Sequence, residues 1–293
     1  MSLTKCPKCD FPCDPASACC EWCKEPLVAS KYTAGLAPQL NSHVAGEGEL
    51  PADFQFRRFE SPGDALTPTA TTYREHFLPL GQIVLVATLP VVVMQVALAS
   101  AEVVSPWTAA ALGSTASYLV NPLMAGALIH TVLSLLRTGK SPTLAESYRR
   151  GLGLWWRLLL CALLSAVIEM AGLLLLVVPG VIASLAFSVA LPALAVENLG
   201  PVEAIRRSAE LTQGSRILIL MTFFLLWAIV AVVTWLTGAS GAGHAGGSFF
   251  PMLVYAVVTE FLSSAFVVLS VFIYLGLRAE KDRATAAALA AGN

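Results

Sequence analysis

The chain has 293 residues, of which 56% are hydrophobic and only 13% are charged, and its net charge is −1. Its mean hydropathy is +0.72. A soluble domain of this size needs more charged side chains to cover its surface, so the composition excludes an ordinary soluble globular fold. Residues 1–76 carry a net charge of −3, which offers no attractive field to a polyanion. We therefore expect no nucleic-acid partner.

Six of the seven cysteines lie close to the N-terminus. Cys6 and Cys9 form one Cys-x-x-Cys pair, and Cys20 and Cys23 form a second. Each pair places two thiolates on one turn, and two pairs complete the tetrahedral coordination that Zn²⁺ prefers. A segment this short has no adequate core, so metal ligation would supply its folding free energy, on the order of 10 kcal/mol. We predict a structural zinc ribbon over residues 1–27 with these four ligands.

Two further cysteines, Cys13 and Cys19, leave the ligand set open, since Cys19 can replace Cys20 with altered spacing. A disordered Cys-rich tail and a redox-active cluster are the alternatives. Clustered cysteines in a cytoplasmic segment favour metal binding over disulfides, which a reducing compartment does not sustain.

Residues 28–72 are rich in Gly, Pro, Ala, Ser, Thr and acidic residues, and Phe54, Phe56 and Phe59 are the exceptions. We interpret this stretch as a flexible linker. Docking of its Phe residues on lipid headgroups or on the protein is the alternative. The first apolar run starts near Phe77, too late for a cleavable signal peptide, so we expect a cytoplasmic N-terminus.

Apolar runs cover most of residues 77–277 and predict an all-α polytopic membrane protein. The first run, residues 77–101, is long enough to cross a hydrocarbon core of ~30 Å at ~1.5 Å per residue. Pro179-Gly180 divides the longest charge-poor run into two helices, and a glycine-rich stretch separates the last two. The six predicted spans are residues 77–101, 108–136, 157–178, 180–197, 217–237 and 250–277.

All Lys and Arg residues fall in the gaps on one side of these spans. Because basic residues collect on the cytoplasmic face, we expect both termini inside, with residues 281–293 as a cytoplasmic tail. Pro142 and Pro201 each open a short segment of such a gap, and we predict two short interfacial helices, residues 143–150 and 202–213. In the second, Val202, Ile205 and Ala209 are expected on one apolar side.

The stretch from Val178 to Arg216 carries a set of small motifs. They are Pro179-Gly180, Leu191-Pro192, Glu197, Gly200-Pro201, Ala204, Arg207-Ser208, Leu211-Thr212 and Gly214. This set resembles the six-helix membrane domain named after glycerophosphoryl diester phosphodiesterase. The resemblance implies a membrane domain over residues 73–280. The head resembles the short zinc ribbons that precede many bacterial membrane domains, which implies a location in the bacterial plasma (inner) membrane. Some members carry a soluble phosphodiesterase barrel, for which this chain has no room, so that activity is not expected.

Glu169 and Glu260 lie inside the third and sixth predicted spans, His130 inside the second and Gln95 inside the first. A charged group at such a depth costs at least ~2.5 kcal/mol, which makes each of the two glutamates and His130 a functional hypothesis. Glu169 and Glu260 are expected in the outer half, where they can share a polar cavity with Gln95. The alternative is a neutral or paired structural role. His130 is expected nearer the inner interface.

Glu197 lies where the fourth predicted span meets the inner interface. It can pair with Arg206, Arg207 or Arg216 and so fix the interfacial helix against the bundle. A solvated loop carboxylate is the alternative.

No nucleophile and general base converge in the sequence, so we expect no enzyme. The first hypothesis is a non-catalytic scaffold or regulator whose zinc-binding head docks a cytoplasmic protein partner, with the lipid bilayer around the bundle. The alternative is a transporter or channel for a small solute or ion that uses Glu169, Glu260 and Gln95. The predicted helices are interrupted at Pro122 and Pro192, which mildly favours a transporter. The predicted spans carry no dense stripe of polar residues, which disfavours one.

Overall fold

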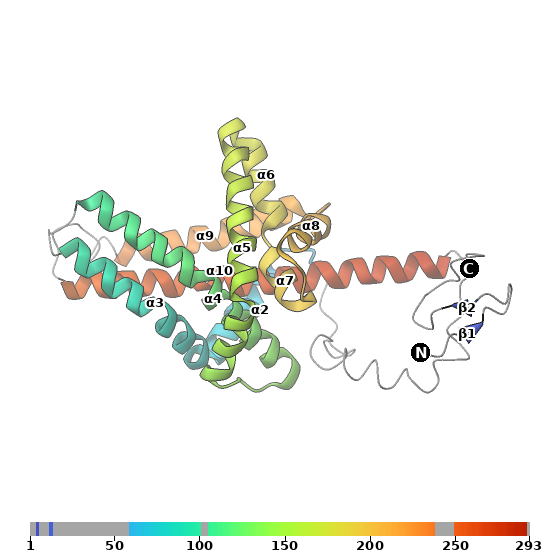
Figure 1. The fold of residues 1–293 in the computed structure, drawn as a ribbon, viewed down its shortest axis with the longest axis horizontal. Helices are drawn as coiled ribbons and strands as arrows, with labels where there is room; N and C mark the ends of the chain where they lie inside the picture. Colours follow the sequence, from blue (N-terminus) through green and yellow to red (C-terminus); the bar gives the residue numbers. More distant parts are fainter. Residues whose placement is uncertain (1–3, 6–11, 14–58, 101–104, 238–248, 292–293) are drawn as a thin grey trace. The chain divides into compact units, whose positions relative to one another are not determined.

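The computed structural model divides the chain into two units, residues 1–52 and 53–293 (Figure 1). The structure describes residues 4–5, 12–13, 59–100, 105–237 and 249–291. In the first unit, strand β1 (Thr4–Lys5) pairs antiparallel with strand β2 (Pro12–Cys13). The predicted zinc ligands Cys6, Cys9, Cys20 and Cys23 lie outside the described residues, as do Cys19, Phe54 and Phe56.

The second unit is helical. Its helices are α2 (Gly63–Glu75), α3 (Phe77–Ser100), α4 (Pro106–Thr138), α5 (Leu144–Leu175), α6 (Val177–Phe187), α7 (Ala190–Glu197), α8 (Pro201–Leu211), α9 (Arg216–Thr237) and α10 (Phe249–Ala291). By length and composition, the described residues hold six helical stretches able to cross a membrane. These candidates are Phe77–Leu98, Trp107–Thr138, Leu144–Leu175, Val177–Glu197, Arg216–Leu236 and Leu253–Arg283.

Helix α5 covers both the interfacial helix predicted at residues 143–150 and the span predicted at 157–178. It starts at a polar cap, where the Thr143 hydroxyl accepts the N–H of Glu146 at 3.3 Å. No proline follows before residue 179, so nothing in the sequence ends the helix between the two predicted segments. Likewise, α10 continues through most of the predicted tail, residues 281–293.

The fourth candidate span is broken between α6 and α7. Pro192 has no N–H to donate to the carbonyl four residues earlier, which weakens the helix there. Ser208 of α8 replaces part of the lost bonding: its hydroxyl donates to the Ala186 carbonyl at 2.7 Å and accepts the N–H of Val189 at 3.3 Å. The break lies close to the interruption predicted at Pro192, and α8 attaches to the span at this point.

The last part of the predicted linker is packed against the helical unit. Phe59 is only 4% exposed and lies against α10, where a Cβ on Gly276 would be 3.2 Å from that of Phe59. Helix α2 follows, with the Asp64 carboxylate accepting the N–H of Ser61 at 2.8 Å before its first turn, and it contacts α3, α9 and α10. A solvated linker up to residue 72 is thus wrong from Phe59 onward, because Phe59 and one face of α2 find apolar partners.

The helices of this unit differ in how much protein covers them. Figure 1 shows α5 and α6 side by side, running crosswise to α3, α4 and α10. In the most apolar 18-residue stretch of α4, 61% is buried within the protein, whereas only 11% of the corresponding stretch of α5 is buried. Helix α5 crosses α4 closely at Gly126 and Gly151, because a Cβ on Gly151 would lie 3.0 Å from the Leu123 carbonyl oxygen. Beyond this crossing, the apolar surface of α5 and α6 is mostly open.

Candidate functional site: the Glu197 network

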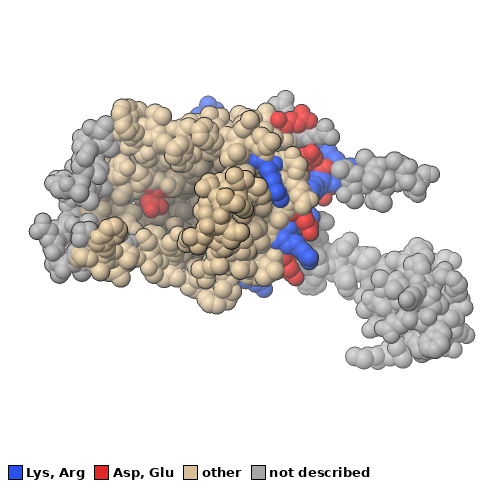
Figure 2. Space-filling view, turned by 90° about the horizontal axis from the view of Figure 1, so that it is seen from above, with Lys and Arg blue, Asp and Glu red and all other residues tan. Residues whose placement is uncertain are grey.

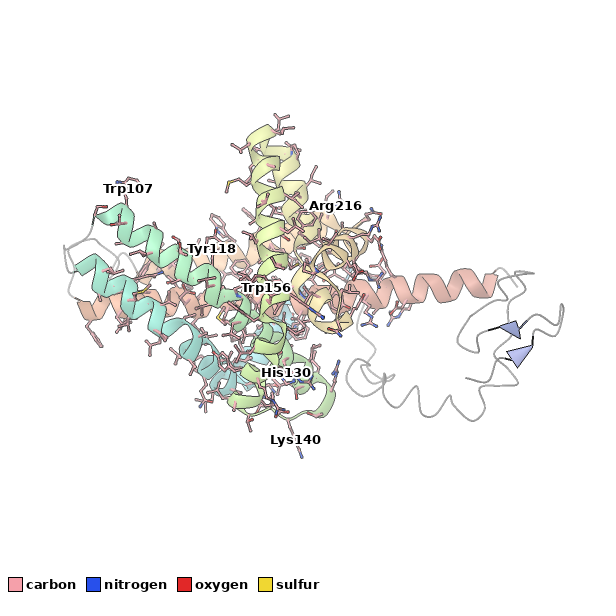
Figure 3. The ribbon with its side chains drawn as sticks, in the orientation of Figure 1. Trp107, Tyr118, His130, Lys140, Trp156 and Arg216 are labelled. Carbon is pink, nitrogen blue, oxygen red and sulfur yellow. The ribbon has the colours of Figure 1, made fainter. Side chains whose placement is uncertain are left out.

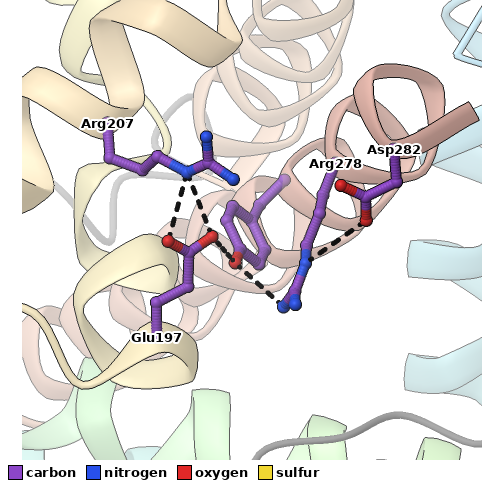
Figure 4. A network of polar contacts seen from close by, with 5 residues as sticks. Glu197, Arg207, Arg278 and Asp282 are labelled. Carbon is purple, nitrogen blue, oxygen red and sulfur yellow. Dashed lines mark hydrogen bonds and ion pairs between the residues drawn. The ribbon is translucent and has the colours of Figure 1, made fainter. Parts of the chain in front are cut away.

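The most connected polar cluster in the described part of the chain is centred on Glu197, at the end of α7 (Figure 4). Arg207 Nε donates to both carboxylate oxygens, at 3.2 and 3.1 Å. The Tyr274 hydroxyl donates to Oε1 at 2.7 Å. Arg278 Nη1 lies 3.4 Å from that hydroxyl, and its Nε pairs with Asp282 at 3.7 Å. We call these five residues the Glu197 network; they join α7, α8 and α10.

Local sequence features place Glu197 and Arg207 opposite one another. Asn198, which ends α7, adopts a left-handed conformation with φ of 51°, and this reverses the chain direction. Pro201 then occupies the first turn of α8, and the Glu203 carboxylate accepts the N–H of Gly200 at 3.0 Å. The tight reversal brings the second turn of α8 back to the end of α7.

Helix α8 is amphipathic, and its buried face differs from the predicted one. Its buried residues are Ala204, Ile205, Ser208 and Leu211. Val202, which was predicted on the same apolar side as Ile205, is 68% exposed. The prediction was wrong for Val202 because the tight α7–α8 turn orients the first turn of α8 outward.

The Glu197–Arg207 ion pair is largely removed from solvent. The Glu197 side chain is 18% exposed and that of Arg207 is 32% exposed. An ion pair in such surroundings contributes only when further hydrogen bonds satisfy the desolvated groups, and Tyr274 supplies one here. The arrangement therefore holds three helices together, and it contains no nucleophile beside a general base.

Of the three predicted partners of Glu197, the structure brings Arg207 into contact. Arg206 is exposed on the other side of α8. Arg216 is the first residue of α9, and Figure 3 shows it above α8 in that view. Among the described residues its buried Nε has no hydrogen-bond partner.

Two contributors to this region were missed by the sequence reasoning. Tyr274 lies in an apolar run and resembles an ordinary core aromatic, although Arg278 follows it by four residues, on the same helix face. Asn198 accepts a hydrogen bond from Arg157 Nη1 at 2.8 Å and so ties α5 to the end of α7. The Tyr-x-x-x-Arg spacing was the signal that could have found Tyr274.

Gln95, one of the polar residues predicted within the spans, joins α3 to α4. Its Nε2 donates to the Ser117 hydroxyl at 3.2 Å. It also lies against Gly113, where an added Cβ would be 2.6 Å from Gln95 Cγ. A hydrogen bond between helices is an ordinary device of membrane bundles, so Gln95 has a packing role in this structure.

Glu169 and Glu260 lie on α5 and α10, and no hydrogen bond among the described residues joins either of them to Gln95. Both are partly buried, and within the described residues neither forms a hydrogen bond or an ion pair. The common polar cavity of these three residues remains a prediction.

His130 lies on α4 between Trp107, near the start of that helix, and Lys140, just beyond its end (Figure 3). Its Nδ1 is buried and has no hydrogen-bond partner in the described part of the chain. The next residue, Thr131, bonds through its hydroxyl to that of Ser147 on α5, at 2.9 Å. His130 therefore borders the polar contact between α4 and α5.

Tyr73 of α2 makes a further polar contact between helices. Its hydroxyl lies 2.7 Å from that of Ser264 on α10, and its ring packs edge-on against Phe261 at 5.5 Å. Burial raises the pKa of Tyr73 to about 12, so the phenol stays neutral under ordinary conditions. The contact anchors α2 to the bundle.

Charged side chains are unevenly distributed over the helical unit. On the face seen in Figure 2, the Lys and Arg side chains gather toward one end, and toward the other end the only charged side chain among the described residues in view is one acidic residue. Within the described residues no group of three His, Cys, Asp or Glu side chains can hold a metal ion. The predicted zinc site thus remains a prediction for residues beyond that part of the chain.

Six long apolar helices, with basic residues at their ends, define a multi-pass helical membrane protein. Over 126 residues the chain is 31% identical to a UPF0259 membrane protein of Sodalis glossinidius (strain morsitans), an alignment that covers 43% of this chain and 50% of that protein. The chain thus spans about half the length of the curated relative that it matches. No family model matches the chain, and no solved structure matches it. Membership of the family named after glycerophosphoryl diester phosphodiesterase stays a prediction.

Proposed function

We propose that this protein is a non-catalytic scaffold or regulator of a bacterial plasma membrane, whose zinc-binding head docks a cytoplasmic protein. The observation that carries the proposal is the Glu197 network. Its charged groups pair with each other and join α7, α8 and α10, which is the behaviour of a fixed structural support. The relative's name, a membrane protein, agrees with this class.

The proposed head is a zinc ribbon with four cysteine ligands, Cys6, Cys9, Cys20 and Cys23. Strands β1 and β2 flank the segment that carries the first two cysteines, as expected for a knuckle between paired strands. Zinc ligation would fold this small head and present a fixed surface to a partner. A zinc-to-protein ratio near one for the purified full-length chain supports the ribbon, and a ratio near zero contradicts it.

The proposed topology places both termini and all basic gaps in the cytoplasm. It follows from the tendency of Lys and Arg to remain on that side. Single cysteines at positions 150 and 206 should react with a membrane-impermeant thiol reagent only after the inner face is opened. Labelling of the two positions from opposite faces would contradict the topology.

The scaffold proposal is tested by separating the head from the bundle. Deletion of residues 1–27 should abolish function and release the cytoplasmic partner in affinity capture from membranes. Glu169→Gln and Glu260→Gln should leave both intact, because in the proposal neither carboxyl lies on a working path. A matched control replaces all four predicted ligands by serine in the full-length chain, which removes zinc but keeps the chain length.

A transporter or channel is the second candidate. The observation that favours it is that Glu169 and Glu260 have no polar partner among the described residues, although burying a carboxyl group in a membrane is costly. In that case Glu169→Gln or Glu260→Gln should abolish uptake in reconstituted vesicles, while deletion of residues 1–27 leaves uptake unchanged.

A further inference from the structure

The α4–α5 connection and the first turns of α5 carry a concentrated positive charge. We call residues 137–157 the basic segment. It contains five basic residues and one acidic residue, Glu146, which gives a net charge of +4. The basic residues are Arg137, Lys140, Arg149, Arg150 and Arg157.

Much of this charge is not neutralised by the protein. Lys140, Arg149 and Arg157 are all exposed. Within the described residues the side chains of Lys140 and Arg149 form no ion pair, and Arg157 is bonded to Asn198, a neutral amide. An exposed guanidinium without a carboxylate keeps its donors available for an anion.

An aromatic side chain marks where this charge meets apolar surface. Trp155 is held in place because its Nε1 donates to the Leu119 carbonyl at 2.8 Å. Trp156 beside it, labelled in Figure 3, is 61% exposed. From Leu160 onward the exposed side of α5 is aliphatic. Tryptophan concentrates at the boundary between headgroups and hydrocarbon, so this order of side chains matches the edge of a bilayer.

The second basic region of the same unit lacks these properties. Residues 197–216, which we call the neutral segment, hold three basic and three acidic residues and have no net charge. Arg207 is paired with Glu197, and exposed Arg206 shares the outer face of α8 with Glu203 and Glu210. Position at a helix end is therefore not enough to produce an unbalanced positive surface.

We propose that the basic segment is a binding site for the headgroups of anionic phospholipids. Arg149 and Arg157 contact the phosphates, Arg150 adds positive charge beside them, and Trp156 lies at the level of the glycerol backbone. Guanidinium groups suit this role because they bind phosphate oxygens in a bidentate manner. The charge complementarity to an anionic leaflet selects lipid as the occupant, and the order of side chains along α5 places its first turns at the level of the headgroups.

The test uses the full-length protein in nanodiscs of phosphatidylcholine and phosphatidylglycerol in equal parts. Native mass spectrometry then counts the lipids that stay bound after release from the disc. We expect the wild type to retain phosphatidylglycerol preferentially. The triple variant Arg149→Gln/Arg150→Gln/Arg157→Gln should lose this preference, by about fivefold for each charge removed. The matched control Arg206→Gln should retain it, since that arginine belongs to the neutral segment.

Two results would overturn the proposal. One is a triple variant that is as helical and as thermally stable as the wild type and still retains phosphatidylglycerol to the same extent. The other is an Arg206→Gln variant that loses as much as the triple variant. A milder double variant, Lys140→Gln/Arg149→Gln, serves if the triple variant fails to fold, because in the described part of the chain neither side chain forms a hydrogen bond or an ion pair that would be lost.

Discussion

The basic segment and the neutral segment contain the same kind of residue and use it in opposite ways. In the neutral segment the guanidinium of Arg207 is enclosed by Glu197 and the neighbouring helices, and its charge is neutralised inside the protein. In the basic segment Arg149 projects from α5 without a carboxylate near it in the described structure. The difference shows that the positive-inside pattern of a membrane sequence combines two physical roles, helix attachment and contact with the bilayer surface.

The largest effect is expected in the neutral segment, for Glu197→Gln. This change leaves Arg207 partly buried without its counter-charge, and should lower the free energy of unfolding by about 2 to 3 kcal/mol. Unfolding in mixed micelles with increasing SDS measures it. Glu210→Gln is the control, since Glu210 is exposed on the same helix and should change stability little. Equal effects of the two changes would show that the network does not hold α7 and α8.

A smaller effect is expected for Ser208→Ala, which leaves the Ala186 carbonyl and the Val189 N–H at the α6–α7 break without their partner. The loss should be about 1 to 2 kcal/mol, because both backbone groups are buried. Ser184→Ala is the control, since that hydroxyl is exposed and bonds only within its own helix. If both variants unfold at the same SDS fraction, the proposed attachment of α8 through Ser208 is wrong.

Within the basic segment, Gly151→Ala should lower stability by about 1 kcal/mol, since the added methyl group meets backbone atoms of α4 at 3.0 and 3.1 Å. Gly153→Ala on the same helix is the matched control, because a Cβ at that position has no neighbour within 4 Å. It should be neutral or stabilising, by up to ~1 kcal/mol, through helix propensity. A stabilised Gly151→Ala variant would mean that α4 and α5 do not cross closely.

The smallest effect on folding is expected for Arg149→Gln. An exposed charge without a partner contributes little to the free energy of unfolding, so the change should stay within about 0.5 kcal/mol in neutral detergent. The same unfolding titration measures it. A loss as large as that of Glu197→Gln would place Arg149 in an internal contact and remove the contrast between the two segments.

The membrane-crossing helices were predictable because lipid imposes a simple rule. An uncharged run of about twenty residues has few other structures available to it, and gaps with basic residues alternate with gaps that have none. The break near Pro192 and the pairing of Glu197 with one of three arginines also followed from the residues. Which arginine pairs was open, since the choice depends on the rotation of α8 set by the turn at Asn198.

Other features carried signals that sequence reasoning weights too lightly. Helix α2 buries Ala65 and Thr69, which are small or weakly polar, and Pro68 lies inside it, so its sequence resembles a linker. The continuity of α5 was hidden because its sequence changes from charged to apolar without any change in backbone structure. In both cases a change in amino-acid composition does not coincide with a helix boundary. The extent of the helix depends instead on packing, of α2 against α10 and of α5 against α4.

The joint between α5 and α6 has a consequence for how the chain enters a bilayer. Only Leu176 separates the two helices, and Gly172 and Gly180 allow them to touch directly behind it. From Met170 to Ala183 no side chain is charged or strongly polar. During synthesis α5 and α6 can therefore enter the bilayer together as one helical hairpin, because no hydrophilic loop between them has to cross the hydrocarbon.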